Sequence, residues 1–175
     1  MEQERRYPVG IQTFSEIITK GYLYIDKTDL MWRMQRLSKF IFLSRPRRFG
    51  KSLLTTTLCS FFRGERELFE GLKVMALEKE WKSYPVLHID VSMAKGKTDA
   101  DALRRALMLQ LKPLKEVYGA DPEENTPGEV FDGLIRRAHQ QTGEQVVVVI
   151  DEYDAPLLDV LHEEETLPAF RRVMQ

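Results

Sequence analysis

The residues with the clearest chemistry are Gly50, Lys51 and Ser52, which end a loop and begin a helical pattern. A glycine-bearing turn that leads into a helix N-terminus supplies N–H donors and a favourable helix dipole for a polyphosphate. In such a site Lys51 would reach the β- and γ-phosphates, and the Ser52 hydroxyl would bind Mg²⁺. The pattern indicates a Walker A loop.

A second segment, Val146–Ile150, is apolar throughout and is followed directly by Asp151 and Glu152. This arrangement is typical of a Walker B strand. Asp151 would hold the same Mg²⁺, usually through water, and Glu152 would polarise the attacking water. A strand ending in Asp-Glu can also simply reach solvent, but the strand, loop and helix around Lys51 favour a nucleotide site.

The loop before Lys51 departs from the pattern G-x-x-x-x-G-K-S, because Arg45 occupies the first glycine position. The guanidinium groups of the arginines in this loop suit bidentate contacts with phosphate. The alternative interpretation is a loop whose charges are only solvated. We expect the nucleotide to be contacted by a continuous run of residues. These are Arg45, Pro46, Arg47, Arg48, Phe49, Gly50, Lys51, Ser52 and Leu53.

Continuous apolar runs separated by helical patterns position these segments and predict an α/β fold with a mostly parallel sheet. The expected strands are 40–43, 85–91 and 146–150, with a short β-like run at 22–25. Start signals and apolar periodicity predict helices that begin near Thr28, Lys51, Thr98 and Thr126, and another over 167–175. We expect Thr28 and Thr98 to cap their helices, and Pro113 to kink or end the helix that begins near Thr98. Thr126 and Glu129 have the pattern of a capping box, and Gly64 is placed to end the helix that begins at Lys51.

The bulk composition excludes several classes of protein. With 175 residues the chain can build one domain with a sizeable core. A net charge of −1 gives no global basic field for nucleic acid, and the single Cys59 excludes an intramolecular disulfide. The N-terminus lacks the apolar core of a signal peptide, and no segment approaches the roughly 18 apolar residues that span a bilayer. We therefore expect a cytoplasmic protein without a membrane partner.

Four segments, 8–11, 22–28, 42–53 and 150–156, together resemble the AAA-ATPase-like domain family found in many bacterial proteins. Many of its members carry a PD-(D/E)XK nuclease-like domain as well. The resemblance implies a P-loop NTPase fold, a three-layer α/β/α arrangement with ATP and Mg²⁺ as cofactors. It assigns Lys51 and Ser52 to Walker A and Asp151 and Glu152 to Walker B. It covers residues 1–175, with 1–38 as a family-specific lead segment and 39–175 as the nucleotide-binding core.

Members of the family continue through a further strand with a polar sensor residue, so we expect this sheet to be incomplete at its C-terminal end. Three functions stay open: Mg-dependent ATP hydrolysis, nucleotide binding without hydrolysis, and binding of a nucleic-acid backbone through the arginine-rich loop. A protein partner or self-association is also open. The signature segment 24–28 could lie beside the nucleotide or brace the loop, and Asp154 could be a loop cap or a site residue.

Overall fold

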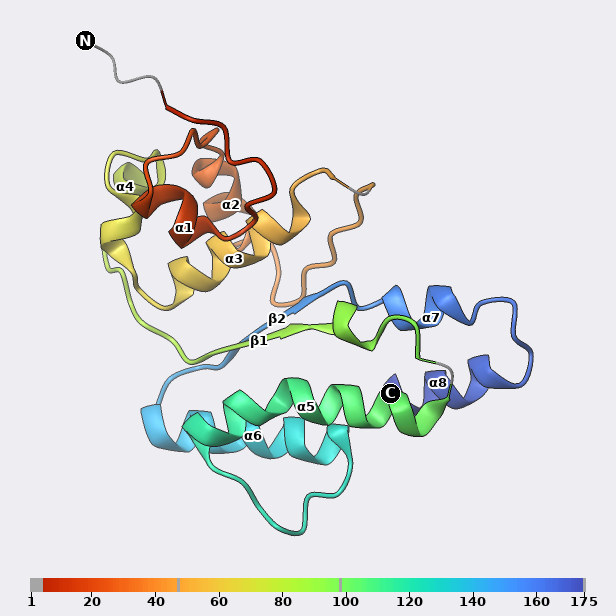
Figure 1. The fold of residues 1–175 in the computed structure, drawn as a ribbon. Helices are drawn as coiled ribbons and strands as arrows, with labels where there is room; N and C mark the ends of the chain where they lie inside the picture. Colours follow the sequence, from red (N-terminus) through yellow and green to blue (C-terminus); the bar gives the residue numbers. More distant parts are fainter. Residues whose placement is uncertain (1–4, 47, 98, 175) are drawn as a thin grey trace. The chain divides into compact units, whose positions relative to one another are not determined.

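The computed structural model describes residues 5–46, 48–97 and 99–174, and the chain divides into two compact units. The first unit is Met1–Tyr84 and the second is Pro85–Gln175. Both are visible in Figure 1, the first in red to yellow and the second in green to blue.

The first unit is helical in the part that the structure describes. Its elements are α1 (Phe14–Thr19), α2 (Thr28–Met34), α3 (Lys51–Phe62), the 3-10 helix η1 (Arg66–Phe69) and α4 (Val74–Leu77). Its core is aromatic: Phe14 lies 4.8 Å from Phe69 between ring centroids, and Trp81 lies 5.2 Å from Phe69 and 5.6 Å from Phe61. Such ring pairs stabilise a small core beyond the area that they bury.

Helix α3 is the element that follows the proposed phosphate loop, and its predicted start at Lys51 is confirmed. It ends at Phe62, and the nearby Gly64 has a φ of 73°, the left-handed conformation that glycine adopts without strain. Phe61 and Thr57 are buried. The loop is therefore attached to a helix that packs into the core of its unit.

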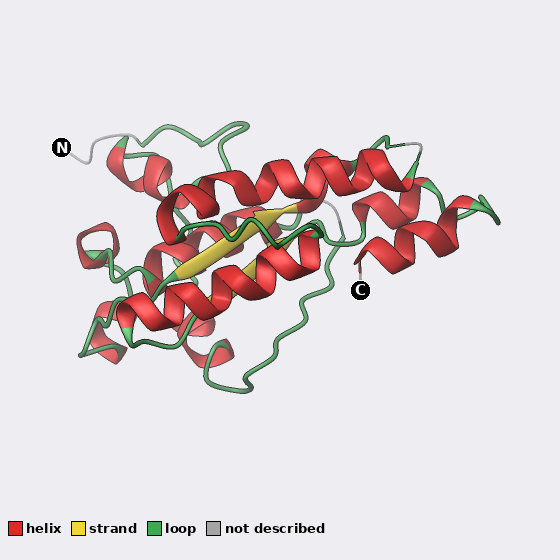
Figure 2. Ribbon diagram, turned by 90° about the horizontal axis from the view of Figure 1, so that it is seen from below, coloured by secondary structure: helices red, strands yellow, loops and turns green. Residues whose placement is uncertain are grey.

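The second unit contains a two-stranded parallel sheet of β1 (Val86–Asp90) and β2 (Val147–Asp151). The register pairs Val86 with Val147 and Asp90 with Asp151. The other elements are the 3-10 helix η2 (Val91–Ala94), α5 (Ala100–Tyr118), α6 (Pro127–Thr142), α7 (Ala155–Asp159) and α8 (Thr166–Met174). Helices α5 and α6 lie side by side on one face of the strands, as Figures 1 and 2 show from two directions.

The helix starts of this unit follow local chemistry. The capping box at α6 is confirmed: the Thr126 hydroxyl accepts from the Glu129 N–H, and the Glu129 carboxylate accepts from the Thr126 N–H. Helix α5 is capped by Asp99, whose carboxylate accepts from the Ala102 N–H at 2.7 Å. The cap predicted at Thr98 lies outside the described residues. Pro113 does not end α5, which continues to Tyr118.

Two predicted strands are wrong. Residues 41–46 and 22–27 have no regular secondary structure, and Phe40 lies in a bend. Apolar composition alone does not make a strand, because a strand is held by hydrogen bonds to neighbouring strands. In the described part of the chain, β1 and β2 form the sheet. The fold is thus α/β with a small parallel sheet and many helices; the three-layer P-loop arrangement stays a prediction.

No helix among the described residues combines the length and apolarity needed to cross a membrane. The predicted division at residue 38 into lead segment and core stays a prediction.

Candidate functional site

The candidate site residues of the first unit are at the N-terminus of α3. Gly50 occupies the N-cap position with φ 75° and ψ 23°, and Arg48 has a φ of 67°. Helices usually begin with a side-chain oxygen that accepts from the first-turn N–H groups, and glycine has none to offer. The first turn of α3 also contains no acidic residue. Its N–H groups and the positive end of the helix dipole are therefore suited to an anion.

Lys51 is held across this loop by backbone carbonyl groups. Its Nζ atom donates to the Arg45 carbonyl at 3.0 Å and lies 3.5 Å from that of Pro46. Carbonyl dipoles are weaker acceptors for an ammonium group than phosphate oxygens, which carry full charge. The contact keeps the cation beside the N-terminus of α3, in a position that an anion can share.

The N-terminal segment is fastened to the middle of α3. The Thr56 hydroxyl donates to the Gln12 carbonyl at 3.0 Å and accepts from the Phe14 N–H at 3.1 Å. Tyr24 packs edge-on against Phe14, with ring centroids 5.2 Å apart, and makes a hydrogen bond with Thr57. Burial raises the pKa of Tyr24, and the bond to Thr57 offsets part of that rise.

The signature segment 24–28 continues this brace through Asp26 and Thr28. The Asp26 carboxylate accepts from the Thr28 N–H at 2.9 Å, the Thr28 hydroxyl at 2.7 Å and the Lys73 N–H at 2.7 Å. The Thr28 hydroxyl accepts in turn from the Val74 N–H at 3.1 Å. Thr28 is thus the first residue of α2, not its cap, and its hydroxyl joins α2 to α4.

These contacts explain the charge of Asp26 and the role of the segment. Burial alone would raise the pKa of Asp26, but the hydrogen bonds from Thr28 and Lys73 outweigh it and lower that pKa. The segment fastens α2 to α4 through Asp26 and contacts α3 through Tyr24. Of the two roles left open by the sequence, the contacts made in this unit favour bracing.

The candidate site residues of the second unit are at the carboxyl end of β2. Asp151 is the last residue of that strand, only 7% exposed, and its Oδ1 atom accepts from the Glu152 N–H at 3.0 Å. Glu152 has a φ of 51°, which is a strained conformation for a residue with a side chain. Strain of this kind is often found where a side chain must be aimed for function.

Sequence reasoning missed Asp90, which the parallel register places beside Asp151 at the same edge of the sheet. Its carboxylate accepts from the Ser92 N–H at 2.9 Å and so caps η2. The signal was present in the sequence, because this strand also ends in an aspartate. Ligands of open parallel sheets bind at the carboxyl ends of the strands, where Asp90 and Asp151 lie.

The structure brings some of the predicted site residues together. Arg45, Pro46, Arg48 and Phe49 are exposed loop residues, and Lys51 contacts the first two. Leu53 packs against the core of the first unit, and Arg47 lies outside the described residues.

Lys51 and Ser52 belong to the first unit, and Asp151 and Glu152 to the second. That the two pairs share one metal ion stays a prediction.

The described residues contain no group of three or more His, Cys, Asp or Glu side chains that could hold a metal ion. A Mg²⁺ ion bound by this chain would therefore need ligands other than such a cluster of side chains. Mg²⁺ commonly takes one or two protein oxygens, with waters and substrate phosphates completing its octahedral shell. The residue types Ser52 and Asp151 fit that kind of site.

The molecule is thus an α/β protein in which Gly50, Lys51 and Ser52 mark the start of α3. The model of a family described as "Predicted AAA-ATPase" matches residues 8–175. The chain belongs to this AAA-ATPase-like family.

A relative from Azotobacter chroococcum mcd 1 is described as "Uncharacterized protein in vnfD 5'region". It is 39% identical over 158 residues, which are 90% of this chain and 30% of the relative. The chain thus spans about a third of that protein's length. No solved structure matched the chain.

Proposed function

We propose that this chain binds ATP together with Mg²⁺ at the loop that precedes α3. The observation that supports the proposal most strongly is the N-terminus of α3. A glycine opens it, no acidic residue occupies its first turn, and the Lys51 ammonium group lies beside the loop carbonyls. N–H donors and a mobile cation at one helix end are what a triphosphate requires.

Each residue then has a defined task. The N–H groups around Gly50 hold phosphate oxygens, and Lys51 exchanges its carbonyl contacts for the β- and γ-phosphates. Ser52 and Asp151 are the protein ligands of Mg²⁺, which when bound would neutralise charge on the phosphate oxygens. Arg45 and Arg48, which belong to the loop, add guanidinium contacts to the phosphates.

Hydrolysis is the second part of the proposal, and it depends on Glu152. A carboxylate at the end of a strand can orient a water molecule and accept its proton. The test is ATP turnover by the wild-type chain, by Lys51→Ala and by Glu152→Gln, with the exposed Glu165→Gln as the matched control. We expect Lys51→Ala and Glu152→Gln to lose turnover and Glu165→Gln to keep it.

The two variants also separate binding from hydrolysis. Glu152→Gln should still bind ATP, because its side chain is not proposed to touch the phosphates in the ground state. Tight binding by the wild type with no turnover would mean a nucleotide-binding module without ATPase activity. Equal turnover in all four proteins would rule out hydrolysis at this site.

A second candidate function is binding of a single-stranded nucleic acid, and the exposed aromatic residues of the loop favour it. Phe42 and Phe49 are 70% and 68% exposed, and Arg45 and Arg48 lie between them in the sequence. Bases can stack on exposed aromatic rings while arginines contact the backbone.

Salt dependence distinguishes this function from nucleotide binding. If both arginines contact phosphates, the double change Arg45→Ala/Arg48→Ala should reduce the log–log salt slope of oligonucleotide binding by about 1.4. A wild-type chain that binds ATP but retains no oligonucleotide at about 50 mM salt would exclude the second candidate.

A further inference from the structure

A groove lies along α5 in the second unit, whereas the candidate nucleotide-binding loop belongs to the first. Its volume is about 850 Å³, and all of its lining residues come from positions 101–127. Met108, Leu109 and Pro127 give it an apolar lining, and Leu109 is 63% exposed. An apolar groove of this size on a helix is typical of a docking surface.

The groove is also basic. Arg104, Arg105, Lys112 and Lys115 line it, against the carboxylates of Asp101 and Glu116, which leaves an excess of two positive charges. The whole chain has a net charge of −1, so this excess is local. One of the four cations, Arg104, already pairs with Asp101 at 2.9 Å. The matching occupant is a segment that carries both apolar and acidic side chains.

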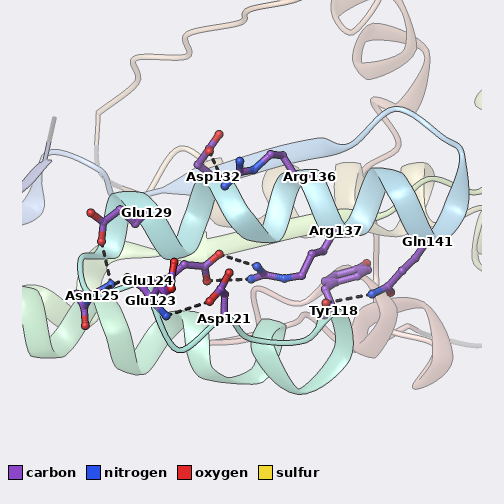
Figure 3. A network of polar contacts seen from close by, with 10 residues as sticks. All are labelled: Tyr118, Asp121, Glu123, Glu124, Asn125, Glu129, Asp132, Arg136, Arg137 and Gln141. Carbon is purple, nitrogen blue, oxygen red and sulfur yellow. Dashed lines mark hydrogen bonds and ion pairs between the residues drawn. The ribbon is translucent and has the colours of Figure 1, made fainter.

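One side of the groove is held in place by a buried ion pair. The segment between α5 and α6 contributes Ala120 and Asn125 to the lining, and it is fastened to α6 through Glu124 and Arg137 (Figure 3). The two side chains form a bidentate pair with distances of 2.6 and 3.1 Å. A groove with a fixed wall loses less conformational freedom when an occupant binds.

The chain carries a segment of the matching chemistry that runs from the end of α7 to the start of α8. Leu158 and Leu161 are about half exposed, and they are followed by the exposed run Glu163–Glu165. This acidic segment, 158–165, supplies none of the residues that line the groove of its own chain. We propose that the acidic segment of one copy docks in the groove of a second copy.

The proposed contact uses two different surfaces, so it is heterologous. After one contact has formed, one copy keeps a free groove and the other keeps a free acidic segment, so further copies can add to a ring or an open chain. The apolar side chains would supply most of the affinity, and the charges would set the partner and the salt dependence. The contact does not depend on nucleotide binding and can be tested without ATP.

The test is the mass of the chain in sedimentation velocity, measured over a range of concentrations. The groove variant is Arg105→Glu/Lys112→Glu, and the acidic-segment variant is Glu164→Lys/Glu165→Lys. Matched controls in the first unit make the same charge changes: Arg63→Glu/Arg66→Glu and Glu67→Lys/Glu70→Lys. Far-UV circular dichroism verifies that each variant is folded.

We expect the mean mass of the wild type to rise with concentration, and to rise less at about 0.5 M salt than at about 0.05 M. Each variant alone should weaken association at least about tenfold. An equimolar mixture of the two should regain it, because the unchanged groove of one variant matches the unchanged acidic segment of the other, and the two reversed surfaces also match. Leu161→Ser, which leaves the charge unchanged, should also weaken association. The controls should behave as the wild type.

Three results would overturn the proposal. A wild type that stays monomeric at every concentration has no such contact. Oligomers that persist in both reversed variants use another surface. A mixture of the two variants that stays monomeric shows that the groove and the acidic segment do not pair.

Discussion

Gly133 lies in the middle of α6, and the change Gly133→Ala should break the ion pair that holds the preceding segment. A Cβ atom at this position would overlap the Glu124 carboxylate, with 2.6 Å to its Cδ atom and 2.7 Å to Nη1 of Arg137. Ordinary carbon contacts begin at 3.4 Å. The carboxylate and the guanidinium group must therefore shift, and we expect the hydrogen bonds drawn in Figure 3 between Glu124 and Arg137 to lengthen.

The size of the effect follows from two opposing terms. The Glu124 and Arg137 side chains are only 8% and 21% exposed, so water does not easily replace the lost partner. A hydrogen bond to a charged group contributes about 1.5–3 kcal/mol, and alanine regains about 1 kcal/mol over glycine inside a helix. We expect a net loss of about 0.5–2 kcal/mol in the free energy of unfolding of the second unit.

Gly128→Ala is the matched control, because this glycine lies in the same helix and a Cβ there meets nothing within 4 Å. It should leave stability unchanged or raise it by up to about 1 kcal/mol. The assay is urea unfolding followed by far-UV circular dichroism. Both tryptophans, Trp32 and Trp81, lie in the first unit, so their fluorescence reports that unit separately.

The effect should also depend on pH. The hydrogen bond from Arg137 lowers the pKa of Glu124, so the pair stabilises the folded chain above the unfolded pKa of about 4.3. That contribution is lost as the pH falls through the lower folded pKa. The difference between the wild type and Gly133→Ala should therefore shrink in acid. Equal stability of Gly133→Ala and Gly128→Ala at neutral pH would refute the reasoning.

Two further predictions concern helix starts. Asp26→Asn should destabilise the first unit by about 1–3 kcal/mol, because an amide N–H must then face one of the donors on Thr28 or Lys73. Tryptophan fluorescence during thermal unfolding measures the loss of stability. Because the pKa of Asp26 is lowered in the folded chain, this loss should become smaller as the pH falls. An unchanged unfolding midpoint would show that Asp26 does not stabilise the first unit. Thr126→Ala should cost about 0.5–2 kcal/mol by removing the cap of α6, whereas Thr126→Ser should keep it. A serine variant as unstable as the alanine variant in urea would show that the cap does not stabilise α6.

Local signals predicted the helices well. The capping box at Thr126, the start of α3 at Lys51 and its end before Gly64 all depend on residues close in the sequence. Such signals act through the backbone N–H and C=O groups of one turn, and tertiary contacts change them little. The strands β1 and β2 were also predicted within one residue of their observed bounds.

The wrong strand prediction and the two residue roles that were not predicted have a common physical cause. The predicted strand over 40–43 has the composition of a strand, but a strand depends on neighbours that composition cannot reveal. Asp26 could not be assigned from the sequence because its partner Lys73 is 47 residues away. Asp99, the cap of α5, was not predicted because Thr98 beside it is also a capping residue type, and only the hydrogen bond to Ala102 identifies Asp99 as a cap.

The central claim is that Lys51 and the N-terminus of α3 bind the phosphates of ATP. Isothermal titration of Mg-ATP into the wild-type chain tests it most directly, beside Lys51→Ala and the exposed Lys79→Ala as a control of equal charge. We expect Lys51→Ala to bind at least about tenfold more weakly, because it loses charge-assisted hydrogen bonds of about 1.5–3 kcal/mol, while Lys79→Ala binds as the wild type does. Equal affinity of all three proteins, or no heat of binding by the wild type, would contradict the claim.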